Sequence, residues 1–475
     1  MRAPRYLVPM IVACALFMEN MDATVIATAL PTIARDFGES PLRLNLAISA
    51  YLLSLAIFIP LSGWLADRLG ARVVFCSAIV VFTLGSVGCS LVGTLHQLVL
   101  ARIVQGMGGA MMVPVGRLVV LRMIPKSELV SAMAYLTVPA LIGPVIGPPL
   151  GGLIVTYASW RWIFLINIPI GVLGFVLAMK FVGNLREEHE EPLDAKGFVI
   201  VALGLAATMF AFENVGRGVL PPAVLGALIA SGAALLALYA WRARRVAAPI
   251  LDLSLLRVQT FRASVAGAFA FRMGMGALPF LVPLMLQLGF GLSPFASGMI
   301  TFASAAGALS MKLVAAPILQ RLGFRRVLLV NTFVSGIFMA SYGFFGPTTP
   351  HAVMIATLLM GGFFRSLQLT SLNTLAYAEV SEASMSRATT LASVGQQLSL
   401  TLGVGLGALL LHATLLWTGN TELGPHDFAP AFFAIAAISS TSLFFFLPLP
   451  RNAGAEISGR TEAREAVADA THAPG

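Results

Sequence analysis

The stretch GWLADRLGAR, Gly63 to Arg72, lies between two long apolar segments. A related stretch, PILQRLGFRR, Pro317 to Arg326, lies between two other apolar segments in the second half. Aligned without gaps, the two share consecutive Arg, Leu and Gly, while Asp67 falls on Gln320. A repeated loop between apolar spans is typical of a membrane protein built from two related halves.

Two further matches occur in the same order along the two halves. Arg102 precedes Gln105 by three residues within an apolar span, and Arg365 precedes Gln368 in the same way. The triplet Ala-Leu-Pro also recurs, at residues 29–31 and 277–279. Secondary transporters are built from repeated bundles, with the substrate site at the interface of the halves, so the repeats indicate a transporter.

The composition is that of a protein that lies mostly inside a bilayer. Hydrophobic residues make up 58% of the 475 residues and charged residues only 11%, whereas soluble proteins have roughly 45 to 50% and about 25%. Apolar runs of about 20 residues predict about fourteen spans. We expect them near 7–29, 46–65, 73–94, 97–120, 130–156, 161–182, 197–214, 220–240, 263–286, 294–318, 327–346, 352–374, 388–411 and 429–449.

The basic residues predict the orientation of these spans. Most of the 30 Lys and Arg fall in alternate loops, which the positive-inside rule assigns to the cytoplasm. An even number of spans then places both termini in the cytoplasm. The net charge of +9 is therefore a topology signal, and nucleic acid is not expected as a partner. The three cysteines all lie in spans, so no disulfide framework is indicated.

These patterns predict an all-α integral membrane protein with two six-helix bundles and two extra central helices. The N-terminal bundle is expected over 1–185 and the C-terminal bundle over 258–450. Residues 186–257 would hold the two extra spans and their connectors. Residues 451–475 lack an apolar stripe and are predicted to form a disordered cytoplasmic tail.

Two acidic residues in the first span are candidates for proton coupling. Glu19 and Asp22 are three residues apart, which places both carboxylates on one face of a helix. Two carboxylates in a low dielectric favour sharing a proton. Arg102 lies within the fourth span and requires an acidic or carbonyl partner. The alternative is that one of the acids pairs with Arg102 only to hold the bundle together.

Cations outnumber acids within the predicted spans. Arg117 lies in the first bundle, and Arg272, Lys312 and Arg365 lie in the second, where no acid accompanies them. This excess raises an alternative, an exporter of organic anions or of metal-carboxylate chelates such as citrate complexes. The candidates for the substrate cavity are Gln105, Arg117, Arg272, Arg365 and Gln368.

Five motifs together resemble the major facilitator superfamily, in its fourteen-span drug:proton antiporter family 2. GWLADRLGAR is similar to the superfamily's loop signature after the second span, and the fourth-span signature resembles Leu98 to Ala110. GPVIGPPLGG, Gly143 to Gly152, resembles the fifth-span antiporter signature. Asp22 to Pro31 and Trp160 to Pro169 look like the first- and sixth-span signatures of the fourteen-span group. The resemblance covers the chain from the first span to about residue 449.

The resemblance implies roles for named residues. Asp67 would bind the N-terminal end of the helix that begins near Arg387, where the helix dipole is positive, and would close a cytoplasmic gate. Asp22, with Glu19 and Arg102, would carry the proton. The gate is expected to comprise Gly63, Asp67, Arg68, Gly70 and Arg72. The antiporter helix is expected to flex at Gly143, Pro144, Gly147, Pro148, Gly151 and Gly152; the alternative is a packing kink without a gating role. Gln320 and Ala71 depart from the family pattern, which suggests that the gate depends on the first half.

The predicted function is proton-coupled efflux of small amphipathic compounds by alternating access. The expected partners are the lipid bilayer, a small-molecule substrate and protons, and the need for a periplasmic adaptor is left open. No cofactor or metal is expected, because the proton gradient supplies the energy. An integral membrane enzyme is disfavoured because the six His are scattered and no nucleophile motif occurs. A structural or sensory membrane protein would have no need of the repeated Arg and Gln pairs.

Overall fold

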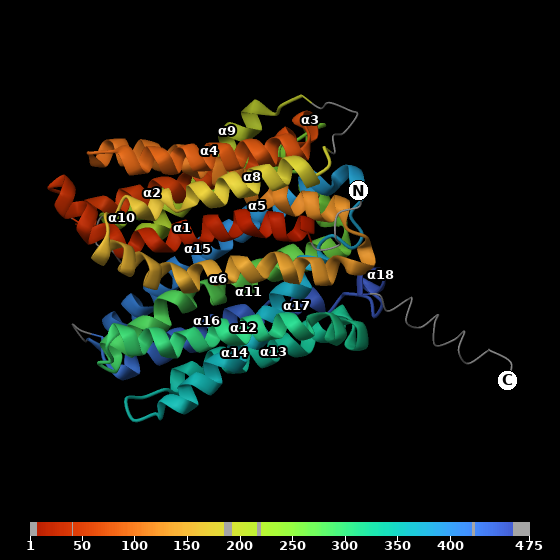
Figure 1. Ribbon diagram of the computed structural model, residues 1–475. Coiled ribbons are helices and arrows are strands. Elements are labelled where there is room, and N and C mark those ends of the chain that lie inside the picture. Colours follow the sequence, from red (N-terminus) through yellow and green to blue (C-terminus); the bar gives the residue numbers. More distant parts are fainter. Residues whose placement is uncertain (1–6, 40, 185–191, 216–219, 420–422, 459–475) are drawn as a thin grey trace.

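The apolar stretches of the sequence are helices, because a chain in lipid must satisfy its backbone hydrogen bonds within each segment. The computed structural model describes residues 7–39, 41–184, 192–215, 220–419 and 423–458. No strand occurs within these ranges. Figure 1 shows long helices that run roughly side by side along one axis.

The first half contains eight helices, of which α2 and α3 form one span and α7 and α8 another. Their bounds are α1 Leu7–Phe37, α2 Pro41–Phe58, α3 Ser62–Leu69, α4 Ala71–Leu91, α5 Leu95–Met123, α6 Leu129–Tyr157, α7 Trp162–Leu165 and α8 Asn167–Phe181. The short 3-10 segments η1 Ile59–Leu61 and η2 Lys126–Glu128 join neighbouring helices.

The second half follows two extra helices, α9 Ala195–Asn214 and α10 Pro222–Ala243. The later elements are η3 Leu253–Arg257, α11 Gln259–Leu284, η4 Met285–Gly289, α12 Pro294–Leu322, α13 Phe324–Ser341, η5 Tyr342–Phe344, α14 His351–Leu375, η6 Glu382–Ser384, α15 Met385–Thr418, η7 Pro425–Phe428, α16 Ala429–Ser440, α17 Leu443–Phe446 and α18 Ala455–Ser458. Of these, η4 is a π-helix and the other η elements are 3-10 helices.

Thirteen helical segments in the described ranges are long and apolar enough to cross a bilayer. The 29-residue helix α6 is a further segment of sufficient length. Together they agree with the predicted count of about fourteen, and the chain is a multi-span membrane protein. The extra helices α9 and α10 were expected at 197–214 and 220–240, and the structure places each within a few residues of that range.

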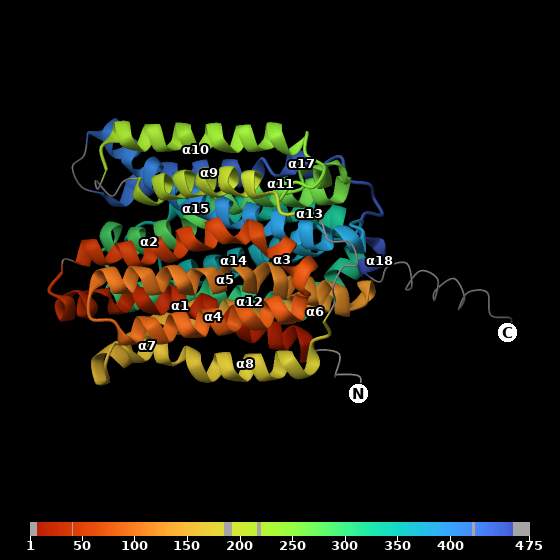
Figure 2. The ribbon, with the colours of Figure 1, turned by 90° about the horizontal axis from the view of Figure 1, so that it is seen from above.

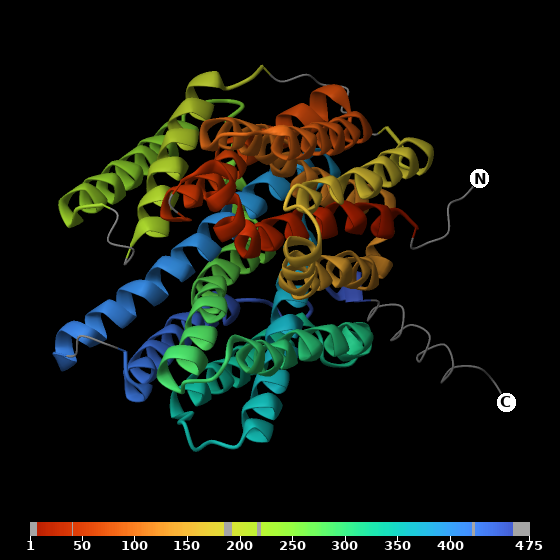
Figure 3. The same ribbon diagram turned by 60° about the vertical axis from the view of Figure 1, so that its left-hand side comes forward.

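The extra helices lie at the side of the molecule, not at its centre. Figures 2 and 3 show the yellow-green pair at one edge, with α10 outermost. The inner helix, α9, contacts both α2 of the first half and α15 of the second. Ser49 on α2 donates a 2.6 Å hydrogen bond to Glu213 on α9. Thus α9 connects the two halves along this side.

The described apolar side chains of the two halves form a common cluster at one end of the molecule. The start of α1 and the short α18 lie at that end, on the right in Figure 1, which we call the terminal end. The cluster includes Leu118, Leu375 and Leu391. Toward the opposite, distal end each half has a separate cluster of its own. Among the described residues, the halves therefore share an apolar core at the terminal end and not at the distal end.

The segment after the last span corrects one prediction. We expected a disordered tail over 451–475, but residues 451–458 are ordered and end in α18. Ile457 is completely buried, and Glu456 lies 3.6 Å from Lys126 of the first half. A few apolar side chains suffice to dock so short a segment, and composition averaged over the tail did not reveal them. Residues 459–475 lie outside the described residues.

Candidate functional site

Asp22 lies in the interior of the first bundle and accepts hydrogen bonds from three side chains. Its Oδ2 accepts from Arg102 Nη1 at 2.5 Å, and its Oδ1 accepts from Gln105 and Asn167 at 2.9 Å each. Only 3% of the residue is exposed. A buried carboxylate is costly unless it is paired and hydrogen-bonded, so these donors stabilise Asp22 as an anion.

Arg102 on α5 is completely buried and connects this helix to α1 and α2 of the first bundle. Besides Asp22, its guanidinium donates to Gln105 Oε1 at 2.6 Å and its Nε donates to the carbonyl of Ala47 at 3.4 Å. The guanidinium carbon also lies 4.2 Å from the ring centre of Tyr51, a cation–π contact. The sequence left open which acid pairs with Arg102, and in the structure it is Asp22; Gln105, expected in the substrate cavity, lies in this network.

Two neutral residues complete the network and were not predicted as site residues. Asn167 begins α8, and its Nδ2 lies 2.9 Å from both Asp22 Oδ1 and Ser86 Oγ. Ser86 on α4 also accepts from Gln105 at 2.7 Å. Asn167 falls inside the sixth-span motif WRWIFLINIP, where a lone amide in an apolar run was the available signal.

Glu19 lies one helical turn before Asp22 and has a different environment. Its Oε2 is buried and has no hydrogen-bond partner, and the same is true of the nearby Tyr51 hydroxyl. Glu19 and Asp22 are close enough to interact electrostatically. The first bundle thus contains two neighbouring carboxyl groups, and within the described residues Asp22 pairs with a cation whereas Glu19 does not.

The predicted gate residue Asp67 lies at the terminal end and contacts the other half. Ser386, in the first turn of α15, donates to Asp67 Oδ2, and Arg122 lies 3.3 Å from Oδ1. The sequence predicted the contact with this helix but not Arg122 as a partner. The positive end of the α15 dipole adds to the attraction for the Asp67 carboxylate.

Glycine at position 63 permits the close approach of the two halves at this gate. A methyl group there would lie 2.5 Å from Thr390 Oγ1 and 3.0 Å from the carbonyl oxygen of Ser386. Gly70 follows the last residue of α3 and has a φ of 93°, a positive backbone angle that glycine adopts more readily than other residues. Arg68 is exposed and lies over the Trp64 ring at 5.3 Å.

The remaining predicted gate residue, Arg72, is the second residue of α4 and is half-buried. Its Nε has no hydrogen-bond partner among the described residues. The contacts found across the gate include those of Gly63 and Asp67.

The predicted antiporter helix is α6, which is continuous over all 29 residues despite its prolines. A methyl group at Gly143 would lie 3.0 Å from the Met21 nitrogen, and one at Gly147 would lie 2.2 Å from Thr24 Oγ1. These glycines allow α6 to pack closely on α1, the helix that carries Asp22. Gly151 is buried, Gly152 is exposed, and the side chains of Pro144 and Pro148 lie outside the described residues.

Two of the five substrate-cavity candidates, Arg117 and Arg272, bind neighbouring residues at the interface of the halves. Arg117 on α5 donates to Tyr377 Oη and to Gln396 Oε1 of the second half, both at 3.3 Å. Arg272 on α11 donates to Asn373 Oδ1 at 2.5 Å. Because Asn373 and Tyr377 are four residues apart in the chain, the two positive charges lie in the same region of the interface.

The candidates Arg365 and Gln368 lie inside the second bundle and not at the interface. Arg365 donates to Tyr342 Oη at 3.0 Å and to Ser304 Oγ. Gln368 is completely buried, accepts from Asn331 and donates to a threonine of α13. These residues form the counterpart of the Arg102 and Gln105 network, but without a carboxylate among the contacts found for them.

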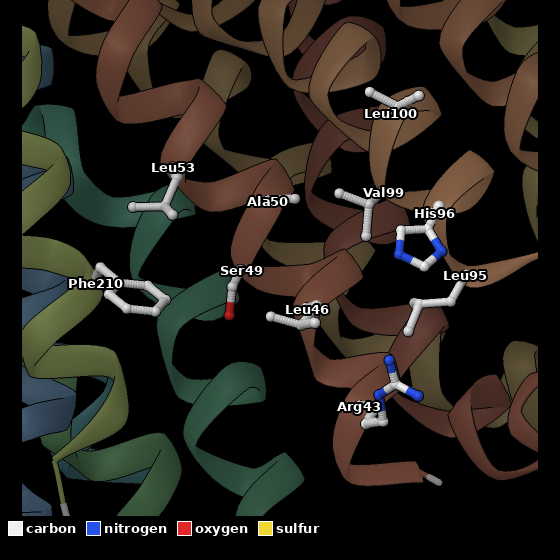
Figure 4. A pocket seen from close by; sticks show the side chains of 10 residues that line it. All are labelled: Arg43, Leu46, Ser49, Ala50, Leu53, Leu95, His96, Val99, Leu100 and Phe210. Atoms are coloured by element: carbon white, nitrogen blue, oxygen red, sulfur yellow. The ribbon is translucent and has the colours of Figure 1, made fainter. Parts of the chain in front are cut away.

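A cavity of about 390 Å³ opens between α2, α5 and α9 (Figure 4). Its wall is mostly apolar, with Leu46, Leu53 and Phe210 around it, and Arg43 and His96 lie toward one side. None of the predicted site residues lines this cavity. Within the described ranges, no cluster of His, Cys, Asp or Glu has the arrangement of a metal site.

Comparison with known proteins identifies relatives over almost the whole chain. The model of the Major Facilitator Superfamily matches residues 12–262 and 264–473. The "Putative multidrug resistance protein MdtD" of Salmonella paratyphi A is 41% identical over 407 residues, which cover 84% of this chain and 85% of the relative. The protein of the same name from Salmonella typhi has the same identity and coverage.

Solved structures with the same fold are much more distant in sequence. The human organic anion transporter MFSD10 has a TM-score of 0.66 at 15% identity, over 93% of this chain and 99% of the other. The proton:xylose symporter XylE has a TM-score of 0.65 at 14% identity, over 96% and 99%. At such identities the likeness concerns the fold alone. With a family model matched along both halves, a bilayer-spanning helical fold and close relatives named as resistance proteins, the chain belongs to the Major Facilitator Superfamily of membrane transporters.

Proposed function

We propose that this protein is a proton-coupled secondary active efflux transporter that exports small amphipathic compounds by alternating access. The main support is the buried carboxylate of Asp22, which accepts hydrogen bonds from Arg102, Gln105 and Asn167 inside the first bundle. Ionisable groups at such depth are costly and mark proton or ion pathways in transporters. The relatives named for multidrug resistance support export of small molecules.

The two carboxyl groups can exchange a proton without leaving a net charge in the bundle. With Asp22 ionised, Arg102 neutralises it, and Glu19 is best accommodated as the protonated acid because it has no cationic partner. Protonation of Asp22 would remove the attraction for Arg102. Since Asp22 lies on α1 and Arg102 on α5, the proton would change how these two helices bind each other.

The contacts at the terminal end support alternating access. The halves meet there through Asp67 and Ser386, through the Gly63 contact, and through one apolar cluster. A transporter of this family must open that end to load substrate and close it to release substrate on the other side. The arrangement corresponds to a conformation that is closed at the terminal end.

We assign the terminal end to the cytoplasm and the protein to the bacterial inner membrane. Basic residues such as Arg122, Arg242 and Arg321 lie in the last turns of helices that lead into loops expected inside by the positive-inside rule. In this orientation the structure faces outward. The proton gradient serves as the energy source and no cofactor is required; the need for a periplasmic adaptor is a separate question for experiment.

The test is proton movement in vesicles that contain purified protein and a pH-sensitive dye. A panel of lipophilic cations and carboxylates is added under an imposed proton gradient, and proton flux that depends on a substrate is recorded. Asp22→Asn should abolish this flux, because the amide has the shape of the acid but cannot exchange a proton.

The matched control is Asp36→Asn, which removes an acid at the distal end that contacts Trp160 and Arg161. This variant should retain the flux. Equal flux in Asp22→Asn and the wild type, with both proteins eluting as folded species, would refute the assignment of Asp22.

A further inference from the structure

Two arginines, one from each half, lie in the same part of the interface. Arg117 and Arg272 are each 7% exposed, and they donate hydrogen bonds to Tyr377 and Asn373, which are four residues apart in the chain. Arg117 lies toward the terminal end of α5, and Arg272 lies midway along α11. The interface therefore contains two positive charges in a region shielded from water.

The contacts of this arginine pair are all with neutral groups. Arg117 donates to the hydroxyl of Tyr377 and the amide of Gln396, and Arg272 donates to the amide of Asn373. In the described part of the chain, neither arginine has a carboxylate within ion-pair distance. Buried charges normally persist only with a counter-charge. The two arginines therefore lack the anion that would neutralise them.

The other buried or half-buried cations inside the helix bundles of the described ranges differ from this pair. Arg102 has its counter-ion in Asp22. Arg365 and Lys312 contact hydroxyl groups of the second bundle only, Lys312 through a 2.5 Å hydrogen bond to Thr370. Arg117 and Arg272 are distinguished because one cation comes from each half and the two repel.

We propose that Arg117 and Arg272 together bind the anionic group of the transported compound, and that this group is a carboxylate. The proposal rests on the proposed function in taking that compound as the cargo, and it narrows the substrates from small amphipathic compounds in general to organic anions. Each guanidinium offers planar N–H donors that match a carboxylate in two-point hydrogen bonding. A carboxylate between them would replace repulsion by attraction.

The position of the pair links binding to the movement of the halves. An anion held by Arg117 of the first half and Arg272 of the second would favour their close approach, as it neutralises both charges. After the anion leaves, the neutral acceptors Tyr377, Gln396 and Asn373 remain to bind the guanidinium groups, as they do here. Loading and closure of the interface are coupled by this exchange of partners.

The experiment compares three ligands that share one aromatic ring system and differ in charge. Purified protein without a membrane gradient is titrated with 1-naphthoate, neutral 1-naphthamide and cationic 1-naphthylmethylammonium, and with aliphatic mono- and dicarboxylates beside their amides. Binding is measured by calorimetry and by the shift in Tm. Carboxylates should bind at least about tenfold more tightly than their amides, as expected for charge-assisted hydrogen bonds.

Two variants, Arg117→Gln and Arg272→Gln, test the site itself. Each should weaken carboxylate binding by about tenfold or more and leave amide binding unchanged. Each should also keep or raise the Tm of the ligand-free protein, because it removes one of two repelling charges; an arginine with a purely structural role would lower the Tm. Lys312→Gln removes an equally buried cation outside the pair and should leave carboxylate affinity unchanged.

Equal affinity for acids and amides throughout the panel, or unchanged carboxylate affinity in Arg272→Gln, would overturn the proposal. Binding without a gradient separates this result from the proposed function. If Asp22→Asn binds carboxylates normally but moves no protons, both proposals are supported. If wild-type protein binds carboxylates but never moves protons, the anion site stands and proton coupling fails.

Discussion

Arg102 donates a 2.5 Å hydrogen bond to the Asp22 carboxylate, and the two side chains are 0% and 1% exposed. The pair joins α5 to α1 across the interior of the first bundle. Removal of one member of a buried ion pair leaves an uncompensated charge, whereas removal of both does not. The relationship is therefore both a stabilising contact and a point at which one proton can alter helix packing.

A double-mutant cycle tests this contact. Arg102→Gln should lower the free energy of unfolding by about 3 to 5 kcal/mol, because Asp22 then remains buried without its cation. Asp22→Asn in the same protein should restore a large part of that loss. The measurement is thermal or denaturant unfolding of the four proteins in detergent. Additive losses in the double variant would contradict a direct interaction between the two side chains.

The close approach of α3 and α15 at Gly63 predicts that a single added methyl group separates these helices. Gly63→Ala should push α3 away from α15, because the new methyl would lie 2.5 Å from Thr390 Oγ1. Hydrogen–deuterium exchange over the first turns of α15 should then become faster. Gly152→Ala is the matched control, since a methyl group there meets no atom within 4 Å. Unchanged exchange in Gly63→Ala would show that these helices are not in contact in solution.

Asn167 should affect both stability and coupling. Asn167→Ala removes the hydrogen bonds to Asp22 and Ser86, and we expect a loss of about 1 to 3 kcal/mol in the free energy of unfolding. Substrate-driven proton flux should fall as well, because Asp22 loses one of its three donors. The measurement combines unfolding with vesicle flux.

The control for Asn167 is Asn331→Ala in the second bundle. Asn331 is 3% exposed and donates to Gln368 and to the Phe364 carbonyl, with no carboxylate involved. A similar loss of stability without a loss of proton flux is expected. If the two variants lose the same fraction of flux, Asn167 has no special role in coupling.

Low pH should weaken the ion pair between Asp194, at the start of α9, and Arg242 of α10. Burial acts to raise the pKa of Asp194, but hydrogen bonds from Arg242 and from the Gly197 N–H outweigh it and hold the pKa below its ordinary value. The contribution of Asp194 to stability is thus full above about pH 3.9, the value in an unfolded chain, and disappears as the pH falls through the lower folded value. Thermal unfolding of wild type and Asp194→Asn from pH 7 to 3 measures it.

For Asp194, the wild type should be the more stable protein at pH 7, and the difference should shrink below about pH 4. Asparagine can still cap the helix, so the difference reports the charge and not the cap. A difference that is constant over the whole range would contradict an ionised Asp194 bound to Arg242.

Much of the fold could be predicted because bilayer thickness sets the length of each apolar run. The range expected for the seventh span, 197–214, differs from α9 by two residues at its start. The prolines of the fifth span were less informative. The helix α6 is continuous through Gly143 to Gly152, and whether it flexes there during transport stays a prediction.

The sequence analysis singled out the charged residues of this network more readily than the uncharged ones. Asp22 and Arg102 stand out in apolar spans, whereas Asn167 and Ser86 are uncharged and resemble ordinary polar residues of a helix. The placement of Arg117 and Arg272 in the same region of the interface could not be predicted either. Helical periodicity describes one helix at a time, and this placement depends on how α5 and α11 of different halves are arranged.

If Asp22 couples the proton gradient to export, its loss should affect substrate accumulation against a gradient but not substrate exchange without one. Vesicles with wild-type protein or Asp22→Asn are loaded with a labelled substrate of the wild type. Exchange across the membrane is measured without a gradient, and accumulation with one. We predict that Asp22→Asn still exchanges substrate but no longer accumulates it. Accumulation by Asp22→Asn at the wild-type level would contradict this role of Asp22.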